Sequence, residues 1–416
     1  MVEKSFEVVE GGILAAEGFV TAALAAGIKP EGLDMLLLHS QAPAAAAATL
    51  TINQMRAAPT YVTEQHVADG SARTVIVSSG NANAATGEQG MAAAVRMAEL
   101  AAQATGVEVT EALVCSTGRI GVQLPMDRIE AAIPKLAQKL SRESADEAAR
   151  AIMTTDTVPK QVAVRFRVGE TPVSIGAICK GAGMICPNMA TMLCFIATDL
   201  AIEPALLRST LQGAVARSFN CISVDGDMST NDTVIVLANG AAGNDTISAE
   251  TDAGYEAFSE ALDFVTVELA KKIAADGEGA SKFVEVRVTG AASYEDAHRV
   301  ARSITNYNLV KTWIYGGAAA PLPGATASPG GEFNWGRAAA AIGAAGVPLE
   351  PTSVEIRIGG IAAFVRGEPA EYDEAAAVAV MSAEEIAIEV DLGAGDERAT
   401  AWTCDLTPEY VRLNAT

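Results

Sequence analysis

The sequence is poor in histidine and in basic side chains, and both shortages exclude classes of function. Only His39, His66 and His298 occur in 416 residues, and none stands at zinc-ligand spacing from another or beside a nucleophile motif. This scarcity argues against a zinc site and against a Ser/His/Asp or Cys/His mechanism. Lysine and arginine total 29 against 51 acidic residues, which gives a formal net charge of −22. A chain this acidic is a poor candidate for binding nucleic acid or an anionic membrane surface, and we interpret its charge as an aid to solubility.

Long apolar runs and paired cysteines are also missing. The uncharged stretch 36–55 contains Pro43 and several polar side chains, so it is a poor membrane span. Residues 1–11 carry charges of both signs and no apolar signal-peptide core. None of the six cysteines belongs to a Cys-x-x-Cys pair. They predict reduced core thiols of a cytoplasmic protein, or alternatively of a mitochondrial-matrix or plastid protein whose targeting segment was removed.

Apolar residues are abundant, and their pattern predicts the fold class. Half of the chain is hydrophobic and 19% is charged, which is typical of a globular protein with room for two or three domains. Apolar strands alternate with amphipathic helices, so we expect an α/β (α+β) fold with sheets sandwiched between helices. Strands at 173–179 and 192–197 are apolar throughout and predict neighbours in one buried sheet. We place a core domain at 1–282 and a smaller α/β domain at 283–416, with a Gly/Ala/Pro-rich insertion at 316–331.

Local signals predict how some helices begin and end. Thr86 is expected to cap a helix over residues 91–104. Ser144 and Glu147 have the spacing of a capping box, which predicts that a helix starts there and runs to Met153. Pro134 interrupts the amphipathic stretch that lies between these two helices.

Residues 180–193 (KGAGMICPNMATML) place two glycines and a proline before an apolar strand, so that Thr191 stands where the strand begins. A loop that enters a strand is the commoner meaning of such a pattern. The sharper hypothesis is that the chain cuts itself between Ala190 and Thr191, which frees an amine that activates the hydroxyl of the same residue. An α-amine has a reference pKa of about 7.7 to 8.0. This value suits a general base at neutral pH, and no histidine is needed.

Three other polar segments qualify as site components. The Thr117 hydroxyl and the Gly118 N–H follow a short strand and together have the groups of an oxyanion hole, although a strand-ending turn is commoner. The loop 225–232 lacks the glycine and glutamate of an EF-hand, so we expect its carboxylates and hydroxyls to pin a loop beside the site. Glu278, between two glycines, is placed to direct a carboxylate into a cleft.

These motifs occur in an order that resembles the ornithine acetyltransferase (glutamate N-acetyltransferase) family of arginine biosynthesis. The similarity spans nearly the whole chain. The matching blocks are residues 79–90, 116–118, 154–157, 180–193, 223–233, 276–280 and 334–337.

The resemblance implies an N-terminal-nucleophile-like, self-cleaving acyltransferase that yields chains 1–190 and 191–416. Acetyl would pass from N2-acetylornithine to L-glutamate in a ping-pong cycle through acetyl-Thr191, with Thr117 and Gly118 as the oxyanion hole. The family needs no cofactor, but acetyl-CoA is a further candidate substrate. Paired αβ units, a heterotetramer, are expected. By the same resemblance the substrate-binding residues are Thr154, Lys180, Thr191, Glu278 and Asn414.

Two other readings stay open at the level of sequence. An amidohydrolase or aminopeptidase with an N-terminal nucleophile would pass its acyl group to water, and product analysis with and without glutamate separates it from a transferase. A non-catalytic paralogue would bind an amino acid without turnover. Relatives carry a few more residues after the position of Asn414, ending in a binding threonine, so we expect this C-terminal contact to be altered here.

Overall fold

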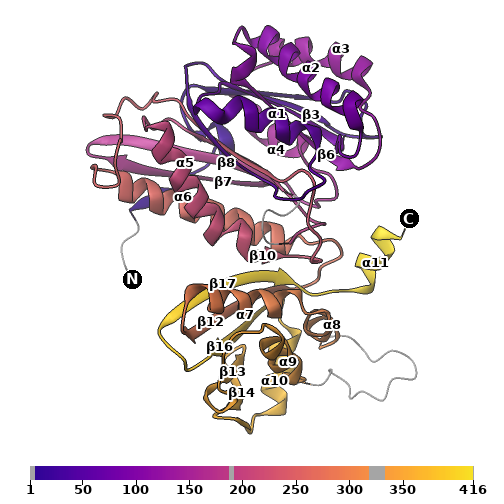
Figure 1. Ribbon diagram of the computed structural model, residues 1–416, viewed down its shortest axis with the longest axis vertical. Helices are drawn as coiled ribbons and strands as arrows, with labels where there is room; N and C mark the ends of the chain where they lie inside the picture. The colour runs from indigo at the N-terminus through magenta and orange to yellow at the C-terminus, as the bar shows by residue number, and fades with distance from the viewer. Residues whose placement is uncertain (1–4, 187–191, 318–332, 416) are drawn as a thin grey trace. The chain divides into compact units, whose positions relative to one another are not determined.

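The computed structural model describes residues 5–186, 192–317 and 333–415 (Figure 1). These residues form two compact units. The larger comprises residues 1–181, 188–220 and 228–269, and the smaller comprises 182–187, 221–227 and 270–416. Two short segments therefore join the C-terminal run to make the smaller unit. The domain boundary predicted at 282/283 falls inside that run and stays a prediction.

A six-stranded sheet forms one layer of the larger unit. Its strand order is β1-β7-β8-β9-β11-β4, and only the β9–β11 pair is parallel. The strands expected at 173–179 and 192–197 are β8 and β9, and they are neighbours in one sheet, as predicted; the pair is antiparallel. The bounds are β1 (Phe6–Val8), β4 (Ala45–Leu50), β7 (Lys160–Val168), β8 (Thr171–Lys180), β9 (Leu193–Thr198) and β11 (Thr233–Ala238).

A four-stranded sheet forms the second β layer, in the order β2-β3-β5-β6. Strand β3 is buried along its whole length, and its side chains alternate between the two faces. Leu36 and Leu38 point to a core shared with Phe195 of the other sheet, whereas Met35 and Leu37 point to a second core under helices α2 (Gly87–Thr105) and α3 (Met126–Gln138). The bounds are β2 (Phe19–Leu24), β3 (Met35–Ser40), β5 (Thr74–Asn81) and β6 (Ala112–Arg119).

Helices cover the outer faces of both sheets, so the larger unit is layered as helices, sheet, sheet and helices (Figure 1). On the six-stranded side, Phe258 of α6 contacts Phe166 of β7, with ring centroids 6.3 Å apart. The predicted arrangement of sheets sandwiched between helices is confirmed. The helices are α1 (Ala58–His66), α2 (Gly87–Thr105), α3 (Met126–Gln138), α4 (Ala145–Ala151), α5 (Pro204–Arg217) and α6 (Tyr255–Ala275).

The smaller unit holds a mixed seven-stranded sheet in the order β10-β17-β12-β16-β13-β14-β15. Alternating valines of β12 are buried, and helix α7 lies against β12 and β17. The strands are β10 (Ile222–Ser223), β12 (Phe283–Ala291), β13 (Glu355–Ile358), β14 (Ile361–Val365), β15 (Glu368–Pro369), β16 (Glu385–Asp391) and β17 (Glu397–Cys404). The helices are α7 (Tyr294–Asn306), α8 (Asn308–Gly316), α9 (Gly336–Ala344), α10 (Glu374–Ser382) and α11 (Pro408–Asn414).

Two capping expectations hold for position but not for hydrogen bonding, and one expectation about α3 was wrong. Ser144 stands at the N-cap of α4, but it donates its hydroxyl to the Thr21 carbonyl instead of capping the helix. Thr86 stands at the N-cap of α2, but its hydroxyl donates to the Asn83 side chain. In both cases a tertiary hydrogen bond takes the hydroxyl that the local pattern assigned to a cap. Helix α3 also continues through Pro134 instead of breaking there.

In the part of the chain that the structure describes, no helix is long and apolar enough to cross a lipid bilayer. The insertion expected at 316–331 lies almost entirely outside the described residues.

Candidate active site

Asp156 lies at the centre of a buried polar cluster in the larger unit. Its Oδ1 accepts hydrogen bonds from the Lys160 ammonium and from the Gly181 backbone N–H, both at 2.7 Å. Its Oδ2 accepts from the Thr154 backbone N–H at 3.1 Å and lies 4.0 Å from Lys180 Nζ. Two residues predicted to bind substrate, Thr154 and Lys180, are thus brought together by a carboxylate to which the sequence analysis gave no role.

The charges around Asp156 keep this carboxylate ionised. Burial on its own raises the pKa of Asp156, but the charges of Lys180 and Lys160 and the Gly181 N–H outweigh burial and lower it to about 2. The two lysine side chains are 2% exposed or less, and the Asp156 side chain is fully buried. The buried pair therefore persists at every pH at which the protein is expected to work.

A third lysine borders the cluster. Lys29 donates from Nζ to the Met153 carbonyl at 2.9 Å. Burial lowers the pKa of Lys29, while the charges of Asp34 and Asp156 act in the opposite direction. Gly80 lets the Lys29 stem approach, because a Cβ at Gly80 would lie 2.6 Å from Lys29 Cγ. Three lysines around Asp156 bring positive charge into this region, which suits a substrate carboxylate.

Thr117 and Gly118, the predicted oxyanion-hole residues, end strand β6 next to this cluster. Thr117 is 2% exposed, and Lys180 donates from Nζ to its hydroxyl oxygen at 3.5 Å. An ammonium group only donates, so the Thr117 proton is left to point to another acceptor. Gly118 has φ +132°, and a Cβ there would lie 2.3 Å from the carbonyl carbon of Gly80. The glycine is therefore required by backbone crowding, and the oxyanion role stays a prediction.

Asn231 fixes this strand end from the loop before β11. Its Nδ2 donates to the Ser116 carbonyl at 2.8 Å and to the Ala82 carbonyl at 2.6 Å. It thereby ties together the ends of β5, β6 and β11, which come from both sheets of the larger unit. Asn231 lies in the polar segment 225–232 noted in the sequence, but this role was not predicted. The contact joins residues 115 positions apart in the chain, which a local pattern does not reveal.

The scissile pair predicted by the sequence, Ala190 and Thr191, lies outside the described residues. The next residue, Met192, is described and fully buried, and its N–H donates to Asp232 Oδ1 at 2.9 Å. Asp232, like Asn231, belongs to the loop that precedes β11. The prediction that carboxylates of this loop pin neighbouring backbone is confirmed for Asp232.

The same prediction is confirmed for Asp225, within the smaller unit. Its carboxylate accepts hydrogen bonds from the backbone N–H groups of Met184 and Ile185 at 2.6 and 2.9 Å. The Tyr410 hydroxyl donates to it at 3.2 Å. Burial raises the pKa of Asp225, against the effect of these backbone donors. The glycine-rich part of the signature is therefore held by a side chain that lies 40 positions later in the chain.

Glu278 and Asn414, the other predicted substrate residues, meet in the smaller unit. Asn414 donates from Nδ2 to Glu278 Oε2 at 2.8 Å. The Glu278 carboxylate lies against Gly183, where a Cβ would be only 2.4 Å away, and the Glu278 N–H donates to the Ala182 carbonyl at 2.8 Å. The signature glycine thus makes room for the carboxylate. Thr154 and Lys180 belong to the larger unit, and Glu278 and Asn414 to the smaller one.

The histidines and cysteines are not arranged for catalysis. His39 contacts the Thr74 hydroxyl, and His66 contacts the Ala112 carbonyl. The structure does bring His298 to Cys221, with Nε2 and Sγ 3.6 Å apart, which the sequence did not predict. Burial raises the pKa of this thiol to about 11, so it is a poor nucleophile. All six cysteines are free, as predicted, and the described residues hold no cluster of metal-ligand type.

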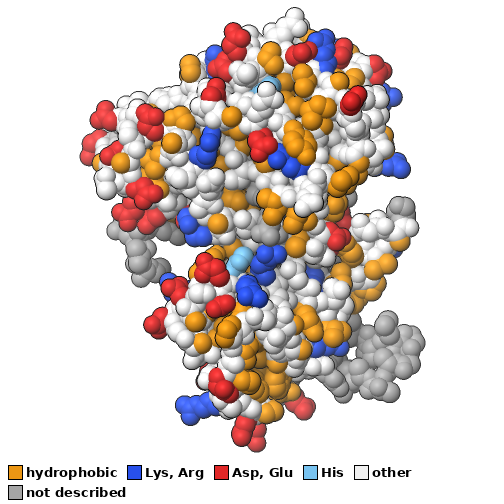
Figure 2. Space-filling model, in the orientation of Figure 1, with side chains coloured by type: hydrophobic (Ala, Val, Ile, Leu, Met, Phe, Trp, Pro, Cys, Tyr) orange, Lys and Arg blue, Asp and Glu red, His pale blue; other side chains and the backbone are white. Residues whose placement is uncertain are grey.

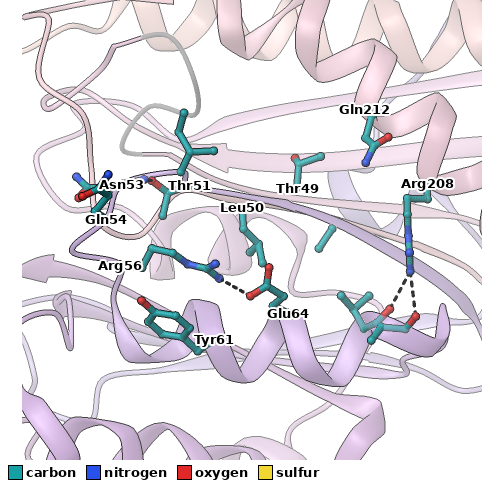
Figure 3. A pocket seen from close by; sticks show the side chains of 14 residues that line it. Thr49, Leu50, Thr51, Asn53, Gln54, Arg56, Tyr61, Glu64, Arg208 and Gln212 are labelled. Carbon is teal, nitrogen blue, oxygen red and sulfur yellow. Dashed lines mark hydrogen bonds and ion pairs between the residues drawn. The ribbon is translucent and has the colours of Figure 1, made fainter.

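A separate cleft of about 690 Å³ opens in the larger unit between α1, β4 and α5 (Figure 3). Its two arginines already have partners: Arg56 pairs with Glu64 at 3.0 Å, and Arg208 donates to the carbonyls of Val67 and Ala68. Elsewhere Figure 2 shows lysine and arginine only in small, separate groups on the drawn face. Lys160 and Lys180 beside Asp156 differ from these surface cations because they are withdrawn from water, so we assign the candidate site to this cluster.

The layered sheets, with a buried lysine–carboxylate cluster beside a Thr–Gly strand end, define a mixed α/β enzyme. Comparison with known proteins identifies its family. The ArgJ family model matches residues 20–416, and the chain belongs to the ArgJ family.

Its relatives include the arginine biosynthesis bifunctional protein ArgJ of Symbiobacterium thermophilum, which is 49% identical over 97% of this chain and 98% of its own length. The protein of the same name from Geobacter sulfurreducens is 46% identical over 96% and 98%. Among solved structures, ornithine acetyltransferase of Mycobacterium tuberculosis in complex with ornithine is 42% identical. The match covers 44% of this chain and 98% of the solved chain, with a TM-score of 0.41.

Proposed function

We propose that this enzyme transfers an acetyl group from N2-acetylornithine to L-glutamate in arginine biosynthesis, with Thr191 as the nucleophile. The observation that carries the proposal is the contact between the Lys180 ammonium and the Thr117 hydroxyl, in a chain of the ArgJ family. Met192, the residue after Thr191, is held nearby in the same unit by a hydrogen bond from its N–H. A cation and a hydroxyl donor held together by buried contacts are the groups that acyl transfer from an amino acid requires.

Maturation precedes turnover in this proposal. The Thr191 hydroxyl attacks the Ala190 carbonyl, and the acyl group moves from nitrogen to oxygen. Water then hydrolyses the ester, which leaves chains 1–190 and 191–416 and a free α-amine on Thr191. That amine has a reference pKa of about 7.7 to 8.0, so it is a suitable base for its own hydroxyl.

Turnover then runs in two halves through an acetyl-enzyme. Thr191 Oγ1 attacks the acetyl carbonyl of N2-acetylornithine, and the Thr117 hydroxyl and the Gly118 N–H donate to the oxyanion. The C–N bond breaks, and ornithine leaves after its α-nitrogen receives the proton. Glutamate enters, and its α-amine attacks the acetyl ester and takes the group. The sequence of events is ping-pong.

We assign roles to the remaining residues of the site from their charges. Lys180, with Thr154 beside it on Asp156, offers a cation to the substrate α-carboxylate. Glu278, supported by Asn414, offers an anion to a substrate ammonium group. Neither step calls for a cofactor. The relatives named above are bifunctional proteins, which favours acetyl-CoA as a second acetyl donor to glutamate.

The assembly and the compartment are part of the same proposal. Cleavage produces an αβ pair, and two such pairs are expected to form a heterotetramer. The relatives named above are bacterial, which favours the cytoplasm as the compartment.

Replacing the nucleophile tests the function. Thr191→Ala should leave one unbroken chain on a denaturing gel and lower acetyl transfer by at least about 10⁴-fold. Thr198→Ala is the matched control, because Thr198 is a buried threonine at the other end of β9 that donates to the Ser174 carbonyl. It should be cleaved and active. An active, uncleaved Thr191→Ala protein would contradict the proposal.

Product analysis separates a transferase from an amidohydrolase. Wild-type protein is supplied with N2-acetylornithine, with or without glutamate, and separately with acetyl-CoA and glutamate. The transferase predicts N-acetylglutamate only when glutamate is present. Acetate released at the same rate without glutamate would favour the amidohydrolase, and ornithine binding with no turnover would favour the non-catalytic paralogue.

A further inference from the structure

Lys29 borders the Asp156 cluster, but the mechanism above gives it no role. It lies in the loop 25–34 that joins β2 to β3, and its side chain is half-buried. Among the described residues its ammonium has one hydrogen-bond acceptor, the Met153 carbonyl at 2.9 Å. An ammonium group has three N–H bonds, so Lys29 keeps donors for a further acceptor.

Asp34 holds the loop that carries Lys29. This carboxylate is fully buried, and its Oδ1 accepts the Ala26 N–H at 2.6 Å. Its Oδ2 accepts the backbone N–H groups of Ile28 and of Lys29 itself, at 2.6 and 3.1 Å. The backbone that carries the lysine is therefore fixed by a single buried side chain, as a preorganised binding residue requires.

The stem of Lys29 lies against the end of strand β5, beside the predicted oxyanion hole. A Cβ at Gly80 would lie 2.6 Å from Lys29 Cγ, so a side chain at this position would displace the stem. Gly80 is the register partner of Gly118 in the parallel β5–β6 pair. Because neighbouring strands lie about 4.7–4.9 Å apart, the lysine stem is close to the backbone of Gly118.

Two lysines therefore reach the same strand ends from different elements. Lys180, at the end of β8, donates to the Thr117 hydroxyl at 3.5 Å and is 2% exposed. Lys29 is the more accessible of the two, and its ammonium is bonded to the carbonyl of the residue before Thr154. Burial is the main reason that the pKa of Lys29 is lowered, and the charge of Lys180 acts in the same direction. A carboxylate bound at Lys29 would offset both effects.

The chemistry of the proposed acceptor calls for a second cation. Glutamate carries two carboxylates, whereas N2-acetylornithine carries one carboxylate and a side-chain ammonium. Lys180 is assigned above to the α-carboxylate, which both substrates have. A second carboxylate brought into a partly desolvated site without a cation would be costly, so a second lysine there favours glutamate over neutral amino acids.

We propose that Lys29 determines the specificity for the acyl acceptor, and that its ammonium binds the side-chain carboxylate of glutamate. The inference rests on the proposed function, which makes glutamate the acceptor. Lys29 takes part in no covalent step and supplies only a charge and hydrogen bonds in the second half of the cycle. In the first half the same charge repels the side-chain ammonium of N2-acetylornithine, so Lys29 does not contribute to donor binding.

Lys29→Met tests the assignment in the full chain. Methionine keeps an unbranched stem against Gly80 but removes the ammonium. KM for glutamate should rise by about 10- to 100-fold, which is the value of a hydrogen bond to a charged group. KM for N2-acetylornithine should not rise, and ornithine should be released at the wild-type rate in a single turnover without glutamate. Lys29→Arg retains a charged donor and should keep KM for glutamate within about fivefold of wild type.

Lys135→Met is the matched control for charge. Lys135 is an exposed lysine of α3 in the same unit, and it lines a different cleft together with Arg128 of the same helix. Its removal lowers the net charge of the chain by as much as the removal of Lys29. Any general loss of attraction for glutamate would therefore appear in both variants. KM for glutamate in Lys135→Met should stay within about twofold of wild type.

A measurement on wild type keeps the inference testable if Lys29→Met does not fold. Glutamine has the size of glutamate but no charge on its side chain, so the two acceptors are compared directly. In wild type, kcat/KM for glutamate should exceed that for glutamine by about 10- to 100-fold. In a folded Lys29→Met protein this preference should fall to about threefold or less. Equal use of glutamate and glutamine by wild type would overturn the assignment.

The outcomes separate this inference from the function on which it rests. A rise of KM for glutamate alone supports the role of Lys29. An active wild type with an unchanged KM for glutamate in Lys29→Met overturns that role and leaves the function intact. A parallel rise of both KM values also overturns it, because Lys29 would then bind the carboxylate that both substrates share. A wild type that transfers no acetyl group from N2-acetylornithine to glutamate overturns the function itself.

Discussion

Two carboxyl groups of the larger unit, Asp156 and Asp232, are both buried but differ in their partners. Asp156 faces two lysines and two backbone N–H groups, and these lower its pKa to about 2 although burial acts to raise it. At Asp232 burial outweighs the Met192 N–H, the charge of Lys180 and the hydroxyl groups of Thr51 and Ser229, so its pKa is raised. Its Oδ2 has no hydrogen-bond partner among the described residues. Burial is thus outweighed at Asp156 and dominant at Asp232, which moves the two pKa values in opposite directions.

The difference indicates two roles, one structural and one chemical, for carboxyl groups of the larger unit. A carboxylate with all its hydrogen bonds satisfied organises the residues around it, and Asp156 does this for Thr154, Lys160 and Lys180. A carboxyl group with an open oxygen keeps capacity for one more partner. Pairs of acidic groups whose pKa values are driven apart are typical of sites that move protons.

The largest expected effect comes from removing the charge of Asp156. Asp156→Asn leaves Lys160 and Lys180 buried without their counter-ion, so the free energy of unfolding should fall by about 3–5 kcal/mol. We suggest measuring urea unfolding in the uncleavable Thr191→Ala background, where a single chain unfolds. The control is Asp146→Asn, whose partner Arg150 lies in an exposed pair at 2.7 Å. It should change stability by less than about 0.5 kcal/mol, and an equal loss in both variants would refute the comparison.

The pH dependence of stability should have opposite signs for the two groups. The folded-state pKa of Asp156 lies below the unfolded value of about 3.9, so its stabilisation is present above about pH 4 and is lost as the pH falls toward 2. The folded-state pKa of Asp232 lies above the unfolded value, so Asp232 penalises the folded state increasingly as the pH rises above about 4.

These two opposite pH dependences are checked by measuring the free energy of unfolding at a series of pH values, again in the Thr191→Ala background. The gap between wild type and Asp156→Asn should close by about 2 kcal/mol from pH 4 to pH 2. Asp232→Asn should gain stability relative to wild type as the pH rises above 4. Parallel curves for all three proteins would show that the two carboxyl groups do not differ.

A smaller effect is expected in the smaller unit, where a glycine makes room for a carboxylate. Gly183→Ala places a Cβ 2.4 Å from the Glu278 carboxylate, which must move. Steady-state kinetics should show a KM for N2-acetylornithine raised by about tenfold, because the ammonium partner is misplaced. The control is Gly343→Ala, because Gly343 lies in α9 with open space around it. Gly243 also has open space, but its positive φ would strain an alanine. An unchanged KM in Gly183→Ala would remove Glu278 from the site.

The smallest effect should come from Asn414→Ala. Asn414 is exposed and supports the Glu278 carboxylate from outside with one hydrogen bond at 2.8 Å. Its loss should raise KM by about threefold, since water replaces an exposed donor at little cost. The same kinetic assay measures it. A larger effect than that of Gly183→Ala would mean that Asn414 contacts substrate directly.

The sequence predicted the strands that are apolar but not those that are rich in alanine. Strands β8 and β9 were recognised because their side chains are buried on both faces. Strand β4 (Ala45–Leu50) was not, because alanine has little preference for strands, and its conformation follows from pairing with β11 along its whole length. Helix α1 was missed for a related reason, since its apolar pattern is weak.

The candidate site was predictable only where a local motif marks it. Short motifs pointed to Thr117 and Lys180, and the structure places these two side chains 3.5 Å apart. The residues that hold them, Asp156 and Asn231, act through contacts with partners 25 and 115 positions away in the chain. Such contacts depend on the fold and leave no local pattern. Ser144 shows the converse, because its local capping pattern was overridden by a contact with Thr21.

The most direct test of the account is the intact mass of purified, active wild-type protein, together with the N-terminal sequence of its fragments. The account predicts two chains that end at Ala190 and begin at Thr191 with a free amine. After brief exposure to N2-acetylornithine without glutamate, the chain that begins at Thr191 should carry one acetyl group. Full activity in an unbroken chain, or an acetyl group on any other residue, would contradict it.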